Sequence, residues 1–382
     1  MTTRTPRGKE PQPRSRATPA TYRARRLAVG AVVLAVVASL GFLTAQALSG
    51  ASSTPPGRTV AAVGTSKTAV SSTTTALRLS APYPVGRLLL TFDEPSSASI
   101  STSDAPAGHP SRVLRTWVRY PASASLGVGG GSPRPPARGS GPFPLIVFSQ
   151  GFDIPAESYG VLMHAWARAG YVVAAPTYPH TSLDGPGPVN EKDIVNHPAD
   201  LRFVISALLA ASNDRSNPLH GLIDQRHIAV VGHSDGGDVS FALAANTCCK
   251  DPRVKAVVVL SGAKLSSFGG RYVTAGSPPL LVVQGTADTV NPQACSIMLY
   301  DPAHAPKFYL EIPAAEHEPP YLSPGPMRRG VEATTTAFLD AYLKGAPKRL
   351  RALKATGNLP AGETLTSRPH LPLTAGSYCP GA

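Results

Sequence analysis

Short runs of apolar residues alternate along the chain with longer segments in which apolar residues recur at helical spacing. Nearly continuous runs of Val, Ile and Leu are typical of strands that are buried on both faces of a sheet. These runs predict strands at Leu88–Phe92, Val113–Tyr120, Leu145–Ser149, Val172–Ala175, Ile228–Gly232, Ala256–Leu260, Leu280–Gln284 and Phe308–Ile312. Helical spacing predicts helices at Glu157–Ala169, Pro198–Ala211, Asp238–Asn246 and Val331–Leu343.

This alternation predicts an α/β fold with a mostly parallel, eight-stranded twisted sheet and helices on both faces. In such sheets, functional side chains gather at the carboxyl ends of the strands. Only Ser261–Pro279 separates the sixth and seventh expected strands, which is too short for a large cap domain. We therefore expect a fairly open site, covered at most by the Gly- and Pro-rich loop Thr181–Asn196.

A different apolar segment lies near the N-terminus. Leu27–Leu48 has 22 residues without a charge, and a helix of that length would reach about 33 Å, enough to cross a membrane. The basic flank that ends at Arg25-Arg26 predicts a cytoplasmic N-terminus and a main domain on the outside. Two interpretations stay open: a signal anchor, or a signal peptide that is cut near Ala47. The basic flank disfavours a third, a buried core helix.

Shifts in composition divide the chain into regions. Segments rich in Ser, Thr, Ala and Pro with few aromatic residues are typical of flexible linkers. The low-complexity stretch 122–142 lies between two expected strands and is interpreted as a surface loop. The expected regions are a basic cytoplasmic leader (1–26), a single-pass membrane helix or signal peptide (27–48), a disordered linker (49–80), the α/β domain (81–345) and an irregular C-terminal tail (346–382).

The net charge of +13 suggests nucleic-acid binding at first sight, but its distribution disfavours that function. Eight of the basic residues fall within the first 26 residues, where there is one acidic residue. The rest of the chain has no basic stripe with interleaved aromatic residues. We expect no nucleic-acid partner, an attachment to the membrane only through the N-terminal segment, and a monomer.

The four cysteines are Cys248, Cys249, Cys295 and Cys379. They form no C-x-x-C pair, and no His-x-His cluster occurs, so we expect no metal site. Outside the cytoplasm they would form disulfides, although free buried thiols are an alternative. Because a bond between adjacent cysteines needs strained geometry, we expect Cys248 and Cys249 to pair separately with Cys295 and Cys379. Such a bond would tie down the C-terminal tail.

The stretch "AVVGHSDGGDVSFALAA" carries the strongest chemical signal. Its G-x-S-x-G pattern, centred on Ser234, follows an expected strand and precedes an expected helix, which is the context of a nucleophile elbow. The small residues let the two backbones approach closely at a tight turn. A phosphate-binding loop is the alternative, but no G-K-[ST] supports it.

A serine hydroxyl needs a general base, and the base needs an orienting acid. Asp288 follows the seventh expected strand and His317 follows the eighth, in the order Ser…Asp…His that accompanies this elbow. The sequence therefore predicts a Ser234–His317–Asp288 triad. We interpret the neighbouring His233 as a packing residue.

The same chemistry needs hydrogen-bond donors for a developing oxyanion. We assign one donor to the backbone N–H of Asp235, which directly follows Ser234. The second assignment is the N–H of Phe152, in the loop after the third expected strand, where Gly151 allows a close turn.

These segments together resemble the α/β-hydrolase family over residues 82–345. The subgroup they resemble contains platelet-activating-factor acetylhydrolases, chlorophyllases and cutinase-like esterases, and the resemblance rests on "RVLRTWVRYPA", "GPFPLIVFSQGFD", "WARAGYVVAAPTYP", "VVGHSDGG", "QGTADTVNP" and "AAEHEPP". It implies that Phe152, Tyr178 and His180 line the pocket. Family members usually carry His-Gly where this chain has Gln150-Gly151, and an uncharged residue at the position of Asp235.

The sequence thus predicts an exported serine esterase or lipase-like hydrolase that cleaves carboxylic esters through an acyl-enzyme, without cofactor or metal. One alternative is an acyltransferase that uses the same acyl-enzyme and passes the acyl group to an alcohol of the cell envelope. The other is a non-catalytic binding domain on the same scaffold.

Overall fold

The computed structural model describes residues 82–96, 108–124, 134–264, 267–272, 276–357, 359–373 and 378–379. The expected leader, the apolar segment 27–48 and the linker 49–80 lie outside the described residues, and so do residues 125–133 of the loop expected at 122–142.

A single mixed sheet forms the centre of the fold, with the strand order β1-β2-β4-β3-β5-β6-β7-β8-β9. Strands β4-β3-β5-β6-β7-β8 are mutually parallel. The outer strands pair antiparallel, β1 and β2 on one side of the sheet and β9 on the other. The bounds are β1 Val85–Glu94, β2 Arg112–Pro121, β3 Phe143–Ser149, β4 Val172–Thr177, β5 Ile223–His233, β6 Val254–Leu260, β7 Leu280–Gly285, β8 Lys307–Ile312 and β9 Thr364–Thr366.

Each of the eight expected strands is present, but the sheet has nine. The ninth, β9, lies in the tail that we expected to be irregular, and so does a helix, α8 (Lys348–Thr356). Strand β9 was not predicted from the sequence, because three residues are too few to show the two-residue period of a strand. Its Leu365 is buried and pairs with Leu310 of β8, so tertiary packing rather than local pattern creates the strand.

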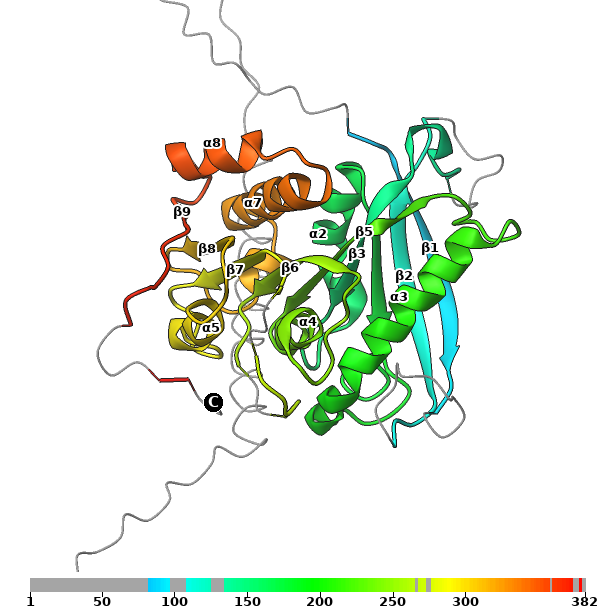
Figure 1. Ribbon diagram of the computed structural model, residues 1–382, viewed down its shortest axis with the longest axis horizontal. Coiled ribbons are helices and arrows are strands. Elements are labelled where there is room, and N and C mark those ends of the chain that lie inside the picture. The colour runs from blue at the N-terminus through cyan, green and yellow to red at the C-terminus, as the bar shows by residue number, and fades with distance from the viewer. Residues whose placement is uncertain are drawn as a thin grey trace, which may run out of the picture. The chain divides into compact units, whose positions relative to one another are not determined.

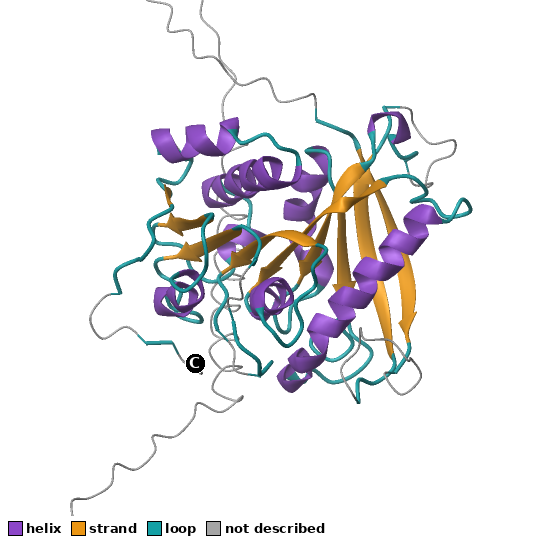
Figure 2. Cartoon of the chain, viewed as in Figure 1, coloured by secondary structure: helices purple, strands orange, loops and turns teal. Residues whose placement is uncertain are grey.

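Helices cover both faces of the sheet (Figures 1 and 2). On one face α3, α4 and α5 pack into a first apolar core, and on the other α2, α6, α7 and α8 pack into a second. The bounds are α2 Gly160–Arg168, α3 His197–Asn213, α4 Asp235–Ala245, α5 Gln293–Tyr300, α6 Pro319–Leu322 and α7 Pro326–Leu343, with 3-10 turns η1 at Arg138–Ser140, η2 at Ala156–Tyr159 and η3 at Glu191–Asn196.

Among the described residues, the continuous stretch Glu191–Asn213 is long and apolar enough to cross a membrane by length and composition. Its apolar side chains are instead part of the first core, where Leu201, Val204, Ile205 and Leu208 are fully buried. Pro198 lies in the first turn of α3, where its missing N–H leaves no bond unmade. We therefore interpret this stretch as a core helix.

All four cysteines form disulfides, but the expected pairing is wrong. Cys248 is bonded to Cys249, and Cys295 is bonded to Cys379. Cys295 is fully buried in α5, and the tail reaches it there, so Cys379 becomes its partner. Cys248 and Cys249 lie in the turn after α4 and are bonded to each other. The expectation that a disulfide ties down the tail is confirmed.

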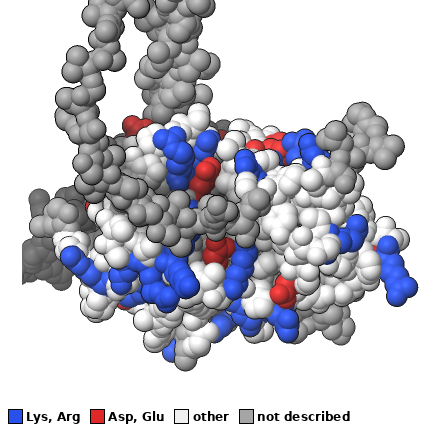
Figure 3. All heavy atoms as spheres, turned by 90° about the horizontal axis from the view of Figure 1, so that it is seen from above, with Lys and Arg blue, Asp and Glu red and all other residues white. Residues whose placement is uncertain are grey.

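The carboxyl ends of the parallel strands form one edge of the sheet, where the loops after β3, β5, β7 and β8 meet. The described residues of the segment between β6 and β7 contain no helix, as expected for a fold without a large cap. On the face shown in Figure 3, Lys and Arg gather in several separate groups with uncharged surface between them. The basic residues therefore form no continuous stripe on that face.

Candidate active site

Ser234 occupies a sharp turn between β5 and α4. Its backbone has φ 54° and ψ −127°, a combination that costs energy for a residue with a side chain. The Ser234 N–H donates to the carbonyl of Leu260 at the end of β6 (2.9 Å), which ties the turn to the sheet. The strain is thus held by the surrounding backbone, as in a nucleophile elbow.

Two glycines make this turn possible. A Cβ at position 232 would lie 1.9 Å from the carbonyl oxygen of Gly236, and a Cβ at position 236 would lie 2.1 Å from the carbonyl oxygen of Ser149. Any larger residue would push the β5 and α4 backbones apart, or push α4 away from β3. The G-x-S-x-G spacing is therefore a packing requirement here.

The structure brings together the three side chains that the sequence singled out. The Ser234 hydroxyl lies 2.9 Å from Nε2 of His317, and Nδ1 of His317 lies 2.8 Å from Oδ2 of Asp288. All three are buried, at 2%, 4% and 5% exposure. The order hydroxyl, imidazole, carboxylate is the one that can move a proton from an alcohol to a base.

The Asp288 carboxylate is held by uncharged donors from its own segment. Oδ1 accepts from the backbone N–H groups of Val290 (3.0 Å) and Asn291 (2.9 Å), and Oδ2 accepts from the Gln284 amide (3.0 Å). Together with His317 these bonds leave the carboxylate one orientation. Gln284 and Asn291 were not predicted from the sequence, although both lie within four residues of Asp288.

The two expected oxyanion donors come from two different segments, the first turn of α4 and the loop after β3. Asp235 is the first residue of α4, at the positive end of the helix dipole. Phe152 follows Gly151, whose own N–H donates to the Tyr159 hydroxyl (3.2 Å). The next residue, Asp153, donates its N–H to the carbonyl of Thr181 (2.8 Å), which ties this loop to the loop after β4.

Gln150 departs from the His-Gly that the resemblance implies. The residue is 2% exposed, and neither its amide nitrogen nor its amide oxygen has a hydrogen-bond partner among the described residues. Its backbone carbonyl lies beside Gly236, so it is packed against the elbow.

Of the three residues expected to line the pocket, one is exposed and two are buried, Phe152 at 8% exposure. His180 is exposed on the loop after β4. Tyr178, by contrast, is fully buried: its ring stacks on His197 at 3.7 Å between centroids, and its hydroxyl lies 2.8 Å from that of Ser149. The structure thus corrects the expectation for Tyr178, which belongs to the core.

The interpretation of His233 as a packing residue was incomplete. The ring is fully buried, but both of its nitrogens are hydrogen-bonded: Nδ1 to the Tyr159 hydroxyl (2.8 Å) and Nε2 to the backbone carbonyl of His317 (3.0 Å). No sequence signal pointed to Tyr159, which lies in the η2 turn.

A second polar group, the buried charge cluster, joins the β1–β2 hairpin to α3 and the turn before it; it consists of Glu94, His109, Arg112, Asp193 and Asp200. Nε of Arg112 lies 2.7 Å from Oδ1 of Asp200, and two other guanidinium nitrogens donate to the Asp193 carboxylate at 2.9 and 2.6 Å. The His109 ring lies 3.2 Å from Glu94 and 3.5 Å from Asp200.

The pKa values in the cluster reflect both burial and these ion pairs. Burial would lower the pKa of His109, but hydrogen bonds to Asp200 and Glu94 outweigh it and raise that pKa to about 9. Burial raises the pKa of Asp200 to about 6, against the opposing effects of His109 and Arg112. For Asp193, hydrogen bonds from His197 and Arg112 outweigh burial and lower the pKa.

Glu94, His109 and Asp200 also offer ligand atoms within 4.8 Å of one another, a placement that could hold a metal ion. Arg112 and a protonated His109 already supply positive charge to the same carboxylates. A divalent cation would have to displace a proton from His109 and sit beside a guanidinium. We therefore interpret the group as a set of ion pairs.

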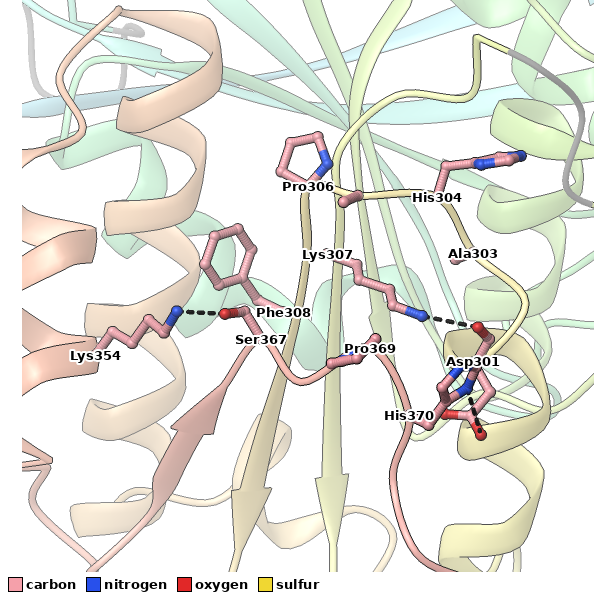
Figure 4. Close-up of a pocket in the computed structure, with 11 residues that line it drawn as sticks. Asp301, Ala303, His304, Pro306, Lys307, Phe308, Lys354, Ser367, Pro369 and His370 are labelled. Atoms are coloured by element: carbon pink, nitrogen blue, oxygen red, sulfur yellow. Dashed lines mark hydrogen bonds and ion pairs between the residues drawn. The ribbon is translucent and has the colours of Figure 1, made fainter.

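A cavity of about 480 Å³ lies away from the triad (Figure 4). Its lining includes Lys307 at the start of β8, whereas His317 follows the end of that strand. The Lys307 ammonium donates to the carbonyls of Tyr300 (2.9 Å) and Asp301 (2.7 Å). The cavity is thus at the opposite edge of the sheet and takes no part in this site.

Several known proteins resemble parts of this chain. A family model described as PET hydrolase-like matches residues 93–342. Cutinase est1 of Thermobifida alba is 29% identical over 200 residues, which cover 52% of this chain and 60% of the cutinase. Chlorophyllase-1, chloroplastic, of Citrus sinensis is 30% identical over 106 residues, 28% of this chain and 30% of the chlorophyllase. The chain therefore spans less than two thirds of the length of these curated relatives.

Proposed function

The chain belongs to the PET hydrolase-like family of α/β-hydrolases, and on that premise we propose that it is a serine hydrolase that cleaves carboxylic esters through an acyl-enzyme on Ser234. Asp288 and His317 are the other members of the proposed triad. The observation that carries the proposal is the continuous bonding from the Ser234 hydroxyl through His317 to Asp288, at 2.9 and 2.8 Å.

In the proposed acylation step, Nε2 of His317 takes the proton of the Ser234 hydroxyl as Oγ attacks the ester carbonyl carbon. The carbonyl oxygen becomes an oxyanion, which accepts hydrogen bonds from the N–H groups of Asp235 and Phe152. The carboxylate of Asp288 stabilises the imidazolium. When the tetrahedral intermediate collapses, the bond to the alcohol oxygen breaks and His317 protonates that oxygen.

Deacylation repeats these steps with water. His317 takes a proton from a water molecule whose oxygen attacks the acyl carbon, and the same N–H groups hold the second oxyanion. The bond to Oγ of Ser234 then breaks, and His317 returns the proton to Oγ. The products are a carboxylic acid and the free enzyme.

The proposed substrates are accessible esters, because the described residues between β6 and β7 add no helix over the site. The relatives named cutinase and chlorophyllase fit an ester substrate. His180, exposed on the loop after β4, is proposed to contact the substrate. The disulfides support export of the domain, held by the segment 27–48 or released after cleavage near Ala47.

The test is turnover of p-nitrophenyl esters of increasing acyl length by the purified protein and by Ser234→Ala. We expect the variant to lose at least about 10³-fold in kcat. Ser240→Ala is the matched control, since Ser240 is an equally buried serine of the elbow helix that lies outside the triad. Undiminished turnover by Ser234→Ala would rule the proposal out.

A further inference from the structure

A line of hydrogen bonds connects the loop after β3, the end of β5 and the loop after β8. The Gly151 N–H, in the loop after β3, donates to the Tyr159 hydroxyl (3.2 Å), which lies 2.8 Å from Nδ1 of His233. Nε2 of His233 lies 3.0 Å from the backbone carbonyl of His317. The line starts one residue before the proposed oxyanion donor Phe152 and ends on the backbone of the proposed base.

Both ends of this line fix the direction of the protons. A backbone N–H only donates and a carbonyl only accepts, so Nε2 of His233 must carry a hydrogen. The Tyr159 hydroxyl accepts from Gly151 and has one hydrogen of its own, which it can donate to Nδ1. Every group is then satisfied with His233 neutral and protonated on Nε2.

A second proton on His233 would break this arrangement. Nδ1 would then become a donor and the Tyr159 hydroxyl would have to turn its hydrogen away. The positive charge would be fully buried, with its ring 4.7 Å from the ring of His317, where the proposed mechanism forms an imidazolium. Burial disfavours such a charge, and two like charges at this distance repel each other.

The packing leaves little freedom around this line. A Cβ on Gly151 would lie 3.1 Å from Nδ1 of His233, 3.2 Å from the Tyr159 hydroxyl and 3.3 Å from Cβ of Ser234. The Tyr321 ring packs on His233 at 4.7 Å between centroids. A shift of His233 would therefore move three segments together. They are the loop after β3 that carries Phe152 (the oxyanion loop), the elbow at Ser234, and the loop after β8 that carries His317 (the His317 loop).

We propose that His233 is a positioning residue for the proposed ester hydrolysis. It stays neutral and fixes the position of the oxyanion loop relative to the His317 loop. The inference rests on the proposed function. It assigns a chemical reason to the histidine at the second position of G-x-S-x-G. A misplacement of about 1 Å at reacting groups can lower a rate about 100-fold, so a residue that fixes two of the loops has a measurable effect.

Steady-state kinetics with a p-nitrophenyl ester tests the inference. We expect His233→Phe, which keeps a ring but loses both hydrogen bonds, to lower kcat about 10- to 100-fold while KM changes little. His233→Gln, whose amide can still donate to the His317 carbonyl, should recover part of that loss. Tyr159→Phe should lower kcat as well, and the double variant Tyr159→Phe/His233→Phe should be no worse than His233→Phe, because the two residues act as one unit.

Tyr321→Phe is the matched control. It removes another buried tyrosine hydroxyl, from a ring that packs on His233, but that hydroxyl bonds to Ser261 and Val283 and not to the groups of the line. We expect it to lower the melting temperature and leave kcat unchanged. Either of two results would overturn the inference. One is a kcat of folded Tyr159→Phe equal to that of the wild type; the other is a double variant in which the kcat losses of Tyr159→Phe and His233→Phe simply add.

Labelling with a fluorophosphonate separates this inference from the proposed function. If the wild-type protein is not labelled at Ser234, the proposed function fails. If the wild type is labelled and His233→Phe is labelled at the same rate, only the positioning role fails.

Discussion

The triad and the buried charge cluster both hide carboxylates from water, but they hold them by different means. Asp288 accepts two backbone N–H groups and an amide in addition to His317. Asp200 instead lies beside the guanidinium of Arg112 and the ring of His109, in a group that contains two further carboxylates.

If the proposed function holds, this difference separates a site that carries out chemistry from a group that holds the fold together. Backbone N–H and amide dipoles that are fixed within a short turn orient a charge without gaining or losing protons themselves. They can therefore support an imidazolium that forms and is neutralised again during a reaction. A network of full charges depends on every partner and changes with pH. The triad should therefore control activity with little effect on stability, and the charge cluster should do the reverse.

The largest expected effect is on the activity of Asp288→Asn. The amide can still accept from Val290 and Asn291, but it cannot stabilise an imidazolium, and it allows His317 to adopt the wrong tautomer. We expect kcat to fall about 10⁴-fold, with a melting temperature close to that of the wild type. Asp301→Asn is the control, since Asp301 lies at the opposite edge of the sheet; an equal loss there would contradict the assignment of Asp288.

Arg112→Met should have the opposite signature. It leaves the carboxylates of Asp193 and Asp200 buried without the guanidinium, and breaking a buried pair in this way costs about 3–5 kcal/mol. Denaturant unfolding measures the loss, and kcat of the folded protein should stay near the wild-type value. The control is Arg226→Met, whose guanidinium is exposed and lies 3.7 Å from Asp224; exposed pairs contribute about 0–1 kcal/mol.

The stability of the wild type should fall as the pH rises from 6.5 to 9. The pKa of His109 is raised to about 9 in the folded protein, so its stabilising effect is complete below its unfolded value of about 6.5 and is lost as the pH passes 9. The loss should reach about 3 kcal/mol. Because the pKa of Asp200 is raised to about 6, its unfavourable ionisation is nearly complete below this window.

Unfolding free energies of the wild type and His109→Gln at several pH values measure this slope. The variant should be less stable at pH 6.5 and show a flatter profile. If the two profiles run parallel, His109 is not the group that titrates.

The smallest expected effect is that of Gln284→Leu on the triad. It removes the amide that donates to Oδ2 of Asp288 at 3.0 Å, and a hydrogen bond to a charged group contributes about 1.5–3 kcal/mol. Since the other donors remain, we expect a loss of about tenfold in kcat, near 1.4 kcal/mol. A loss as large as that of Asp288→Asn would mean that the backbone donors do not orient the carboxylate.

The same contrast explains which parts the sequence could predict. The elbow follows from local spacing, and the strands from apolar runs, because each depends on residues close together in the chain. The charge cluster joins Glu94, Arg112 and Asp200 from three distant segments, and no local sequence pattern indicates that these segments come together. Strand β9 and the pairing of Cys295 with Cys379 were missed for the same reason: they depend on where the tail packs.

Labelling of the purified protein with a fluorophosphonate, followed by mass spectrometry of its peptides, tests the central claim most directly. If Ser234 is a nucleophile activated by His317, a single adduct forms on Ser234, and the labelling rate falls by about 10³-fold or more in His317→Ala. An adduct on another serine, or a labelling rate that His317→Ala leaves unchanged, would contradict it.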